Sequence, residues 1–436
     1  MILCRQDWEL LQRRTYWARR WHALALFAAT ALALFSASFA PAQAEAQSQG
    51  QAFGLEISGN IRTRTDYIDH LTRVCLTQVR LGAGTSEIEH LLRQCLLNTK
   101  IFSEVTVTAA RRHITVEVKE RTTLIPIPYL QVDTGQSRKI GVIMLESNFL
   151  GMGKTVASGA SLANQGVSFF GYYQDPSVLY SDWGGEALMD HTRENLIQYR
   201  RNTVVDSYAE TTNGFLSGTG YRWNQFSLKG HVGFRERTYY RVDTFVPPND
   251  HSFGFGNVVA EYSTKDFAFY CNQGLTLRLN VTQQAWRTDS MHLAGNADYL
   301  MNWENLVFSG HAVQIQISGG GVRGGGREDA YRLGGTRGLR GIETKSAWAD
   351  HYDALALDYQ IPLQTYQSGT LTSGLFNDRG LIRMRGPDDT IIHYDAFGIG
   401  AYFYLKEFTL PGLGLDLGYN REFQGLFANL TAGLSI

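Results

Sequence analysis

The sequence of 436 residues lacks an excess of charge of either sign. Lysine and arginine number 40 against 41 aspartates and glutamates, and the four types together make up only 19% of the chain. A nucleic-acid-binding protein usually carries a clear basic excess. The balanced composition therefore predicts that nucleic acid is not a partner.

Long apolar runs are missing after the first 40 residues. No later stretch approaches the ~20 consecutive apolar residues that a transmembrane helix needs. With 45 glycines and 12% aromatic residues, the composition instead suits a β-barrel. Any role in a membrane must therefore come from strands.

Motifs for catalysis and cofactor binding are missing as well. GMGKT at 151–155 looks like the end of a phosphate-binding loop, but Asn148 stands where that loop requires glycine. The two HYDA copies, which start at His351 and His393, have no third set of ligands for a metal ion. No cysteine pair has zinc spacing and no G-x-S-x-G motif occurs. The sequence thus predicts no catalytic residue, no metal and no cofactor, and we do not expect an enzyme.

Residues 1–46 have the features of a cleaved signal peptide. Four arginines between positions 13 and 20 precede an apolar run at 23–40 and the small-residue sequence AQAEA at 42–46. A retained membrane anchor is the alternative, because about 18 apolar residues can nearly span a bilayer. The A-x-A pattern favours cleavage, and we therefore expect export.

Residues 53–120 are predicted to form a small α+β domain, followed by a connector at 121–137. Periodicity predicts its elements, in chain order, as a strand at 53–59, a helix at 65–76, a second helix that includes 88–96, and strands around 105–107 and 114–118. Ser86 and Glu89 have the spacing of a capping box for the second helix.

This order of elements resembles a POTRA domain, the periplasmic module that precedes certain outer-membrane barrels. The resemblance rests on ISGNIRT at 57–63, LLNTKIFSEVTV at 96–107 and VEVKERTTLIPIP at 116–128. Cys75 and Cys95 lie on the inner faces of the two predicted helices. They form either a disulfide, in an oxidising compartment, or two buried free thiols.

Residues 138–436 are predicted to form a closed, all-β transmembrane barrel of about sixteen antiparallel strands. Residues 275–281, for example, place three leucines and a valine on one side and threonine, arginine and asparagine on the other. A wall between lipid and a wet lumen requires this alternation. A β-sandwich would also alternate, but the number of such segments favours a barrel, whose closure satisfies every strand edge.

The stretch YRLGGTRGLRGI at 331–342 lies in a loop of about thirty residues between the eleventh and twelfth predicted strands. It is similar to the signature loop of the POTRA-bearing outer-membrane superfamily, the bacterial surface antigen family, which includes barrel-assembly proteins and two-partner secretion transporters. The resemblance implies a glycine pair, Gly334 and Gly335, and a tip of Arg340, Gly341 and Ile342 that folds back into the lumen. Ile342 replaces the usual aromatic residue of that tip.

The family's partner motif, F-x-D-x-G, occurs here as Phe376, Asp378 and Gly380 on a nearby strand. A guanidinium group inside a barrel needs an acceptor, and a carboxylate can accept two charge-assisted hydrogen bonds from it. We therefore expect Arg340 to pair with Asp378.

The resemblance implies a bacterial outer-membrane protein whose POTRA domain lies in the periplasm. Unfolded client polypeptides would be inserted or translocated by β-augmentation, in which a client adds as a strand to a sheet edge. Outer-membrane lipid and accessory periplasmic or lipoprotein subunits are further expected partners. Insertion of barrels and secretion of a soluble partner are not separable from the sequence. The alternative class is a passive or structural outer-membrane pore whose POTRA domain docks a partner.

Overall fold

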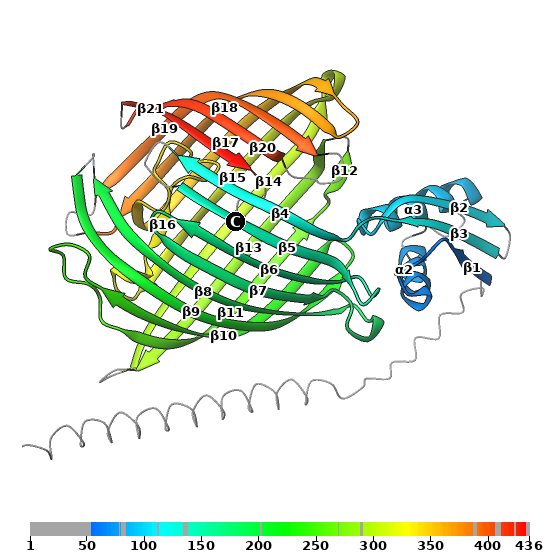
Figure 1. Ribbon diagram of the computed structural model, residues 1–436, viewed down its shortest axis with the longest axis horizontal. Helices are drawn as coiled ribbons and strands as arrows, with labels where there is room; N and C mark the ends of the chain where they lie inside the picture. Colours follow the sequence, from blue (N-terminus) through cyan, green and yellow to red (C-terminus); the bar gives the residue numbers. More distant parts are fainter. Residues whose placement is uncertain are drawn as a thin grey trace, which may run out of the picture. The chain divides into compact units, whose positions relative to one another are not determined.

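The computed structural model describes residues 54–77, 79, 84–110, 113–133, 138–200, 203–268, 270–287, 291–386, 390–405, 411–422 and 424–432. The predicted signal peptide at 1–46 lies outside the described residues, as does the end of the chain at 433–436. The described residues belong to one compact unit, which contains a small α+β part and a closed barrel (Figure 1).

The α+β part has the predicted order of strand, helix, helix, strand and strand. Its elements are β1 Gly54–Ser58, α2 Thr65–Leu76, α3 Thr85–Asn98, β2 Phe102–Ala110 and β3 His113–Glu120. β3 is central, parallel to β1 and antiparallel to β2. Among the described residues, β1 and β2 therefore each have one edge without a strand partner. No helix in the described part of the chain has both the length and the apolar character of a membrane span.

The two helices cover the sheet through a core that the alternation of β3 predicts. Ile114 and Val116 are buried on one face of β3, because alternate side chains of a strand point to the same side. Ile68 of α2 and Leu92 of α3 belong to the same core and are 0% exposed.

The start of α3 differs from its prediction. The helix follows Gly84, and no side chain caps its first turn, so the capping box of Ser86 and Glu89 is wrong. The Glu89 carboxylate instead accepts a hydrogen bond of 2.8 Å from the backbone N–H of Ala109 in β2. Glu89 thus bonds to the sheet and not to the first turn of its own helix. The spacing of residues along the sequence does not reveal such a contact.

A disulfide between Cys75 and Cys95 joins α2 to α3. Of the two alternatives for this pair, the bonded one is present. Cys271, in the barrel, is a buried free thiol. A cross-link over 20 residues restricts the unfolded chain, and a loop of this length contributes about 3 kcal/mol of stability.

Replacing both cysteines, in a Cys75→Ser/Cys95→Ser variant, is expected to lower the stability of the α+β part by about 3 kcal/mol. The measurement is amide hydrogen exchange of α2 and α3 in the full chain, with the barrel strands as an internal reference. Unchanged exchange in both helices would contradict a stabilising role of the cross-link.

The barrel strands are β4 Leu124–Asp133, β5 Arg138–Phe149, β6 Lys154–Ala163, β7 Gly166–Asp175, β8 Trp183–Arg200, β9 Thr203–Trp223, β10 Phe226–Tyr240, β11 His251–Ser263, β12 Asp266–Ala268, β13 Cys271–Arg287, β14 Met291–Val307, β15 His311–Gly324, β16 Tyr331–Leu333, β17 Ala347–Thr365, β18 Gly369–Met384, β19 Ile391–Leu405, β20 Pro411–Asn420 and β21 Gly425–Ala432. They run obliquely around the barrel (Figure 1), and antiparallel β21 closes on β4. The strands on either side of the short β12 and β16 also pair directly, so the described residues form sixteen full strands.

The barrel begins earlier than predicted. β4 lies inside the expected connector at 121–137 and pairs with both β5 and β21. The connector is therefore only 121–123, and the predicted barrel start at residue 138 is wrong. Pro126 and Pro128 argue against a strand in this segment of the sequence, because proline within sheets is confined to strand edges and bulges.

The long strands place apolar side chains outward and polar ones inward. In β13, Leu277, Leu279 and Val281 are 41%, 51% and 45% exposed on the outside. Between them, Arg278 and Asn280 line the interior. The outer surface is thus suited to lipid and the interior to water.

Glu120, at the end of β3, fixes the loop that follows β1. Its carboxylate accepts hydrogen bonds from the backbone N–H groups of Ile61, Arg62 and Thr63 at distances between 2.7 and 3.1 Å. Burial favours the neutral acid, but these N–H groups outweigh it and lower the pKa of Glu120 below its ordinary value of 4.5.

The same loop contacts the turn between β5 and β6. Asn148 Nδ2 donates to Thr63 Oγ1 at 2.9 Å, and the Arg64 N–H donates to the Gly151 carbonyl at 2.9 Å. This turn therefore marks the rim of the barrel beside the α+β part, which we call the near end. The opposite rim is the far end.

The lowered pKa of Glu120 predicts that the stability of the loop after β1 depends on pH only at acidic pH. The stabilisation is complete above pH 4.5 and is lost as the pH falls through the lowered pKa. Hydrogen exchange of the amides of Ile61 to Thr63 should show protection that declines only in that acid range. A Glu120→Gln variant should lack this pH-dependent step, and its presence in that variant would contradict the assignment.

Candidate functional site

The loop between β15 and β17 folds back from the far end into the barrel lumen. It joins the eleventh and twelfth full strands of the described barrel, the position that the sequence predicts. Residues 337–341 make polar contacts with inward-facing side chains of β17, β18, β19, β20 and β21.

Arg340 lies at the centre of these contacts, and the structure brings it together with Asp378. Its Nε and Nη2 donate to the two carboxylate oxygens of Asp378 at 2.9 and 2.6 Å. The backbone N–H groups of Gly338 and Arg340 donate to the same carboxylate at 3.0 and 3.1 Å. Arg340 is 5% exposed and Asp378 is 0% exposed, so neither charge can be screened by water.

Two further carboxylates complete the site. Arg340 Nη1 donates to Asp358 of β17 at 2.8 Å and lies 3.8 Å from Asp416 of β20. Arg337 Nε lies 3.4 Å from the other oxygen of Asp358, an ion pair without hydrogen-bond geometry. We call Arg337, Arg340, Asp358, Asp378 and Asp416 the arginine site. Its three carboxylates outnumber its two guanidinium groups.

Phe376 provides the aromatic contact of the arginine site. The Arg340 guanidinium carbon lies 3.9 Å from the centroid of the Phe376 ring, a cation–π geometry. Phe376, Asp378 and Gly380 face the lumen together because they alternate along β18. Ile342, which replaces the usual aromatic residue, is 5% exposed in an apolar cluster with Phe376 and Phe427.

Close approach explains two of the predicted glycines. A Cβ atom on Gly341 would lie 2.8 Å from the ring of Phe427 and 3.0 Å from the Tyr394 hydroxyl. That hydroxyl accepts a hydrogen bond of 2.7 Å from the Gly341 N–H. A Cβ atom on Gly380 would lie 3.2 Å from Leu339 of the loop. The loop tip therefore packs against the wall at distances that leave little room for a Cβ atom.

Gly334 and Gly335 form the neck of the loop. Their φ angles are +122° and +71°, a region that residues with a Cβ atom rarely adopt. The Gly335 N–H donates to the Ile342 carbonyl at 2.8 Å, which closes the segment between them. The glycine pair thus shapes the neck of the loop.

A second set of contacts fixes the base of the loop at the far end. The Arg332 guanidinium carbon lies 3.7 Å from the ring centroid of Trp348. Asp329 Oδ1 accepts hydrogen bonds of 3.0 Å from Arg237 and 2.8 Å from Gln284. The loop is therefore attached to the barrel both at its tip and at its base.

Arg337, Asp358 and Asp416 of the arginine site were not among the predicted site residues. Arg337 is in the quoted loop, but the family motif gives it no role. Asp358 and Asp416 each take an inward position in an alternating segment, in LALDYQI and LGLDLGYN. A charged residue on the inward side of a strand was the available signal, although only the fold shows that both carboxylates meet Arg340.

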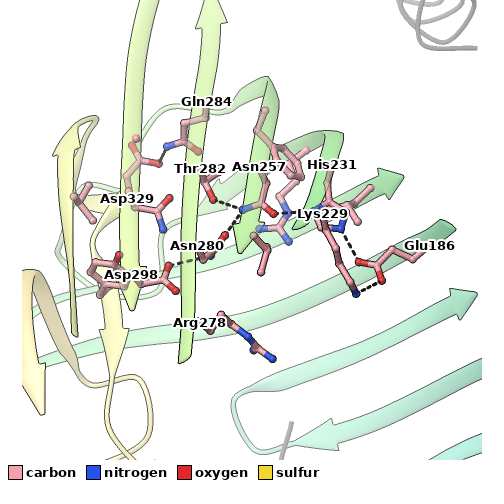
Figure 2. Close-up of a pocket in the computed structure, with 18 of the residues that line it drawn as sticks. Glu186, Lys229, His231, Asn257, Arg278, Asn280, Thr282, Gln284, Asp298 and Asp329 are labelled. Atoms are coloured by element: carbon pink, nitrogen blue, oxygen red, sulfur yellow. Dashed lines mark hydrogen bonds and ion pairs between the residues drawn. The ribbon is translucent and has the colours of Figure 1, made fainter. Parts of the chain in front are cut away.

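A separate cavity of about 760 Å³ lies along the lumen wall built by β7 to β15. Figure 2 shows its side chains, with hydrogen bonds that cross from strand to strand. His231 Nε2 lies 2.6 Å from Glu186, and its Nδ1 lies 2.8 Å from Asn257. Asn257 bonds to Asn280, whose Nδ2 donates to Asp298 at 3.0 Å. No sequence motif marks this row of polar side chains.

Among the described residues, no group of three or more histidine, cysteine, aspartate or glutamate side chains has the arrangement of a metal site. His351 lies 3.0 Å from Asp353 of the same strand, within one HYDA copy. The Asn148 side chain accepts a hydrogen bond of 2.9 Å from the Gly153 N–H, so GMGKT forms a turn between strands.

Solved barrels have the same fold. BamA from Haemophilus ducreyi lacking POTRA domains 1-3 matches with a TM-score of 0.58 at 12% identity, over 88% of this chain and 85% of that chain. CdiB from Acinetobacter baumannii matches with 0.55 at 13%, over 89% and 74%, and CdiB from Escherichia coli with 0.50 at 10%, over 90% and 92%. No protein-family model and no curated protein sequence matches the chain. The predicted closed antiparallel barrel of about sixteen strands is confirmed.

Breaking the pair of Arg340 and Asp378 from either side is expected to destabilise the barrel by about 3 to 5 kcal/mol, because the remaining charge stays buried. Urea unfolding of Arg340→Met and Asp378→Asn variants in detergent micelles measures this loss. The double variant should lose less than the sum of the two single variants.

The matched control is Arg379→Ala. Arg379 follows Asp378 in the chain, but its side chain is 67% exposed and lies 3.9 Å from Asp395. An exposed pair contributes about 0 to 1 kcal/mol. Equal losses in the Arg340 and Arg379 variants would contradict a buried charge network.

Proposed function

We propose that this chain, which shares its barrel fold with BamA and CdiB, is an outer-membrane protein that inserts or translocates client polypeptides. The observation that carries the proposal is the arginine site, in which Arg340 is buried against Asp378 inside a closed barrel. This is the arrangement that the loop and partner motifs predict together.

Location in the outer membrane follows from the barrel wall. Among the described residues, β21 pairs with β4 at Leu130–Asp133 and so closes the sheet into a barrel, the architecture that satisfies strand edges in lipid. The outward side chains of β13 are apolar and exposed, and lipid would cover them. The predicted export signal at 1–46 agrees with this location.

The α+β part acts as a POTRA-type domain in the periplasm. β2 has one edge without a strand partner among the described residues, and an extended client can pair with such an edge through its backbone. Accessory periplasmic or lipoprotein subunits would bind here by the same chemistry. No nucleotide is needed, because satisfying the client's backbone groups provides the driving force.

The loop acts as an internal brace that links strands β17 to β21 on the lumen side. Its tip is hydrogen-bonded to side chains of five strands. At its base, Asp329 accepts hydrogen bonds from Arg237 and Gln284 of the barrel wall, and Arg332 lies over the ring of Trp348. Movement of a client past the loop would require these contacts to rearrange. A loop that is not coupled to transport would instead only fill the lumen.

The alternative is a passive or structural pore whose α+β part docks a partner. The arginine site distinguishes the two functions. A loop that is held in the lumen obstructs it and predicts a small, fluctuating conductance in a planar bilayer. A passive pore predicts a steady conductance that does not change in an Asp378→Ala variant.

Client binding is tested with photo-crosslinking residues at Thr106 of β2 and Glu117 of β3, which are register partners. The probe is a urea-unfolded, soluble polypeptide diluted onto the protein in phosphatidylcholine vesicles. Crosslinking at Thr106 should exceed that at Glu117 several-fold, because β3 is paired on both sides.

Variants Arg340→Ala and Asp378→Ala, shown to be folded, are then expected to bind the probe at Thr106 but to pass it on less efficiently than the parent. Protease protection of the probe in the vesicles measures the transfer. Transfer equal to that of the parent would remove the assigned role of the loop, and absence of crosslinks at Thr106 would favour the passive pore.

A further inference from the structure

We infer that the outer face of the barrel binds the phosphate group of a membrane lipid at the far end, between Arg379 of β18 and Arg421, which follows β20. This site depends on the proposed function only through the location of the barrel in a membrane. Three features of the wall carry the inference: an uncompensated positive charge, the level of that charge on the wall, and the apolar surface beside it.

Arg379 and Arg421 lie on the outside of the wall formed by β18, β19 and β20, which are neighbours in the barrel (Figure 1). Asp378 faces the lumen, so alternation directs Arg379 outward, where its side chain is 67% exposed. The Arg421 side chain is 65% exposed, and its guanidinium carbon lies 5.4 Å from the ring centroid of Phe397, an outward residue of β19. Both guanidinium groups are therefore accessible from the lipid side.

The two guanidinium groups share one carboxylate. Arg421 Nη1 donates to Asp395 of β19 at 3.0 Å. Arg379 Nε lies 3.9 Å from the other oxygen of that carboxylate, too far for a hydrogen bond, and Asn377 Nδ2 donates to this oxygen at 3.3 Å. Within the described part of the chain, no second carboxylate forms an ion pair with either arginine. One positive charge is thus left uncompensated.

The level of this charge on the wall matches the edge of the lipid-facing band. Phe397 and Ile399 of β19 are 44% and 55% exposed on the outer face. Asp395 precedes Phe397 by two residues, a rise of about 7 Å along the strand. A charged residue on the lipid face is unfavourable at the middle of a bilayer and tolerated near its surface. The two arginines therefore lie at the level of the lipid headgroups.

An apolar surface continues from the charges toward the near end. Tyr419 of β20 is registered with Phe397, and Leu417 with Ile399. The rings of Phe397 and Tyr419 lie 6.1 Å apart between their centroids, and aromatic side chains at this level are typical of a membrane interface. A ligand that fits both parts has an anionic head and hydrocarbon chains. This combination selects a lipid over a free phosphate ion.

One HYDA copy, residues 393–396, serves both faces of the wall here. Its Tyr394 faces the lumen, where the hydroxyl accepts the hydrogen bond from the Gly341 N–H. Its Asp395 faces outward between the two arginines. The lipid site thus lies behind the arginine site, and substitutions on its outer side leave the lumen contacts of the loop in place.

Phosphate has the chemistry that the two arginines require. A guanidinium group donates two parallel hydrogen bonds to a phosphate in a fixed geometry. A headgroup phosphate between Arg379 and Arg421 supplies the missing negative charge, while Asp395 repels it. Removal of the Asp395 charge therefore strengthens binding, and removal of either arginine weakens it.

The test measures lipid binding to the full chain in neutral detergent micelles by native mass spectrometry. The probes are phosphatidic acid and phosphatidylcholine with the same acyl chains, and inorganic phosphate serves as the competitor. The variants are Arg379→Gln, Arg421→Gln and Asp395→Asn. Arg193→Gln is the matched control, because Arg193 is an exposed arginine of β8 that also lies over an aromatic ring, that of Tyr240.

Phosphatidic acid should bind the parent chain about tenfold more tightly than phosphatidylcholine, as one charge-assisted contact would produce. Arg379→Gln and Arg421→Gln should each lose most of this difference, and Arg193→Gln should keep it. Asp395→Asn should bind phosphatidic acid several-fold more tightly than the parent. This gain keeps the test decisive even if an arginine variant fails to fold.

Equal binding of the two lipids by the parent, or an equal loss in Arg193→Gln, would overturn the inference. Weaker binding by Asp395→Asn would overturn it as well. Displacement of phosphatidic acid by an equal concentration of inorganic phosphate would assign the site to free phosphate and not to a lipid.

The proposed function fails or survives separately from this site. Its client crosslinks at Thr106 are measured in phosphatidylcholine vesicles, which contain no phosphatidic acid. Crosslinks at Thr106 without selective lipid binding would defeat the lipid site alone. Selective lipid binding without crosslinks at Thr106 would defeat the handling of clients alone.

Discussion

A guanidinium group that is enclosed by a barrel must be neutralised there, and much of this structure follows from that requirement. Arg340 is 5% exposed and cannot use water as its partner. Asp378 and Asp358 supply charge on the neighbouring strands β18 and β17, and Phe376 supplies a ring face. Gly341 lets the backbone come close enough for this contact. The ion pairs of Arg340 with carboxylates of the wall thus hold the loop in the lumen.

Strand alternation decides which residues can take part. On β18, residues two apart share a face, so Phe376, Asp378 and Gly380 reach the lumen as a set while Arg379 between them is exposed outside. The same rule directs Asp358 inward and Leu357 outward on β17. A shift of one residue in register would exchange these faces and expose the carboxylates to lipid.

The sequence predicted the elements with a strong local pattern. The alternation of 275–281 and the glycine and arginine stretch at 331–342 identified the barrel and its inward loop. β4 was missed because two prolines hide its alternation, and the capping box at Ser86 failed because Glu89 bonds to β2. Arg337, Asp358 and Asp416 meet only through the closure of the sheet. The distance between these three side chains depends on which strands are neighbours in the barrel. The periodicity along a single strand does not predict strand neighbours.

The excess of carboxylates in the arginine site has one more consequence. If the loop left the lumen, Asp358, Asp378 and Asp416 would remain on the wall without their cations. The vacated passage would then attract small cations and repel anions, much as a ring of acidic residues does in a channel. Withdrawal of the loop would therefore increase the preference of the lumen for potassium over chloride.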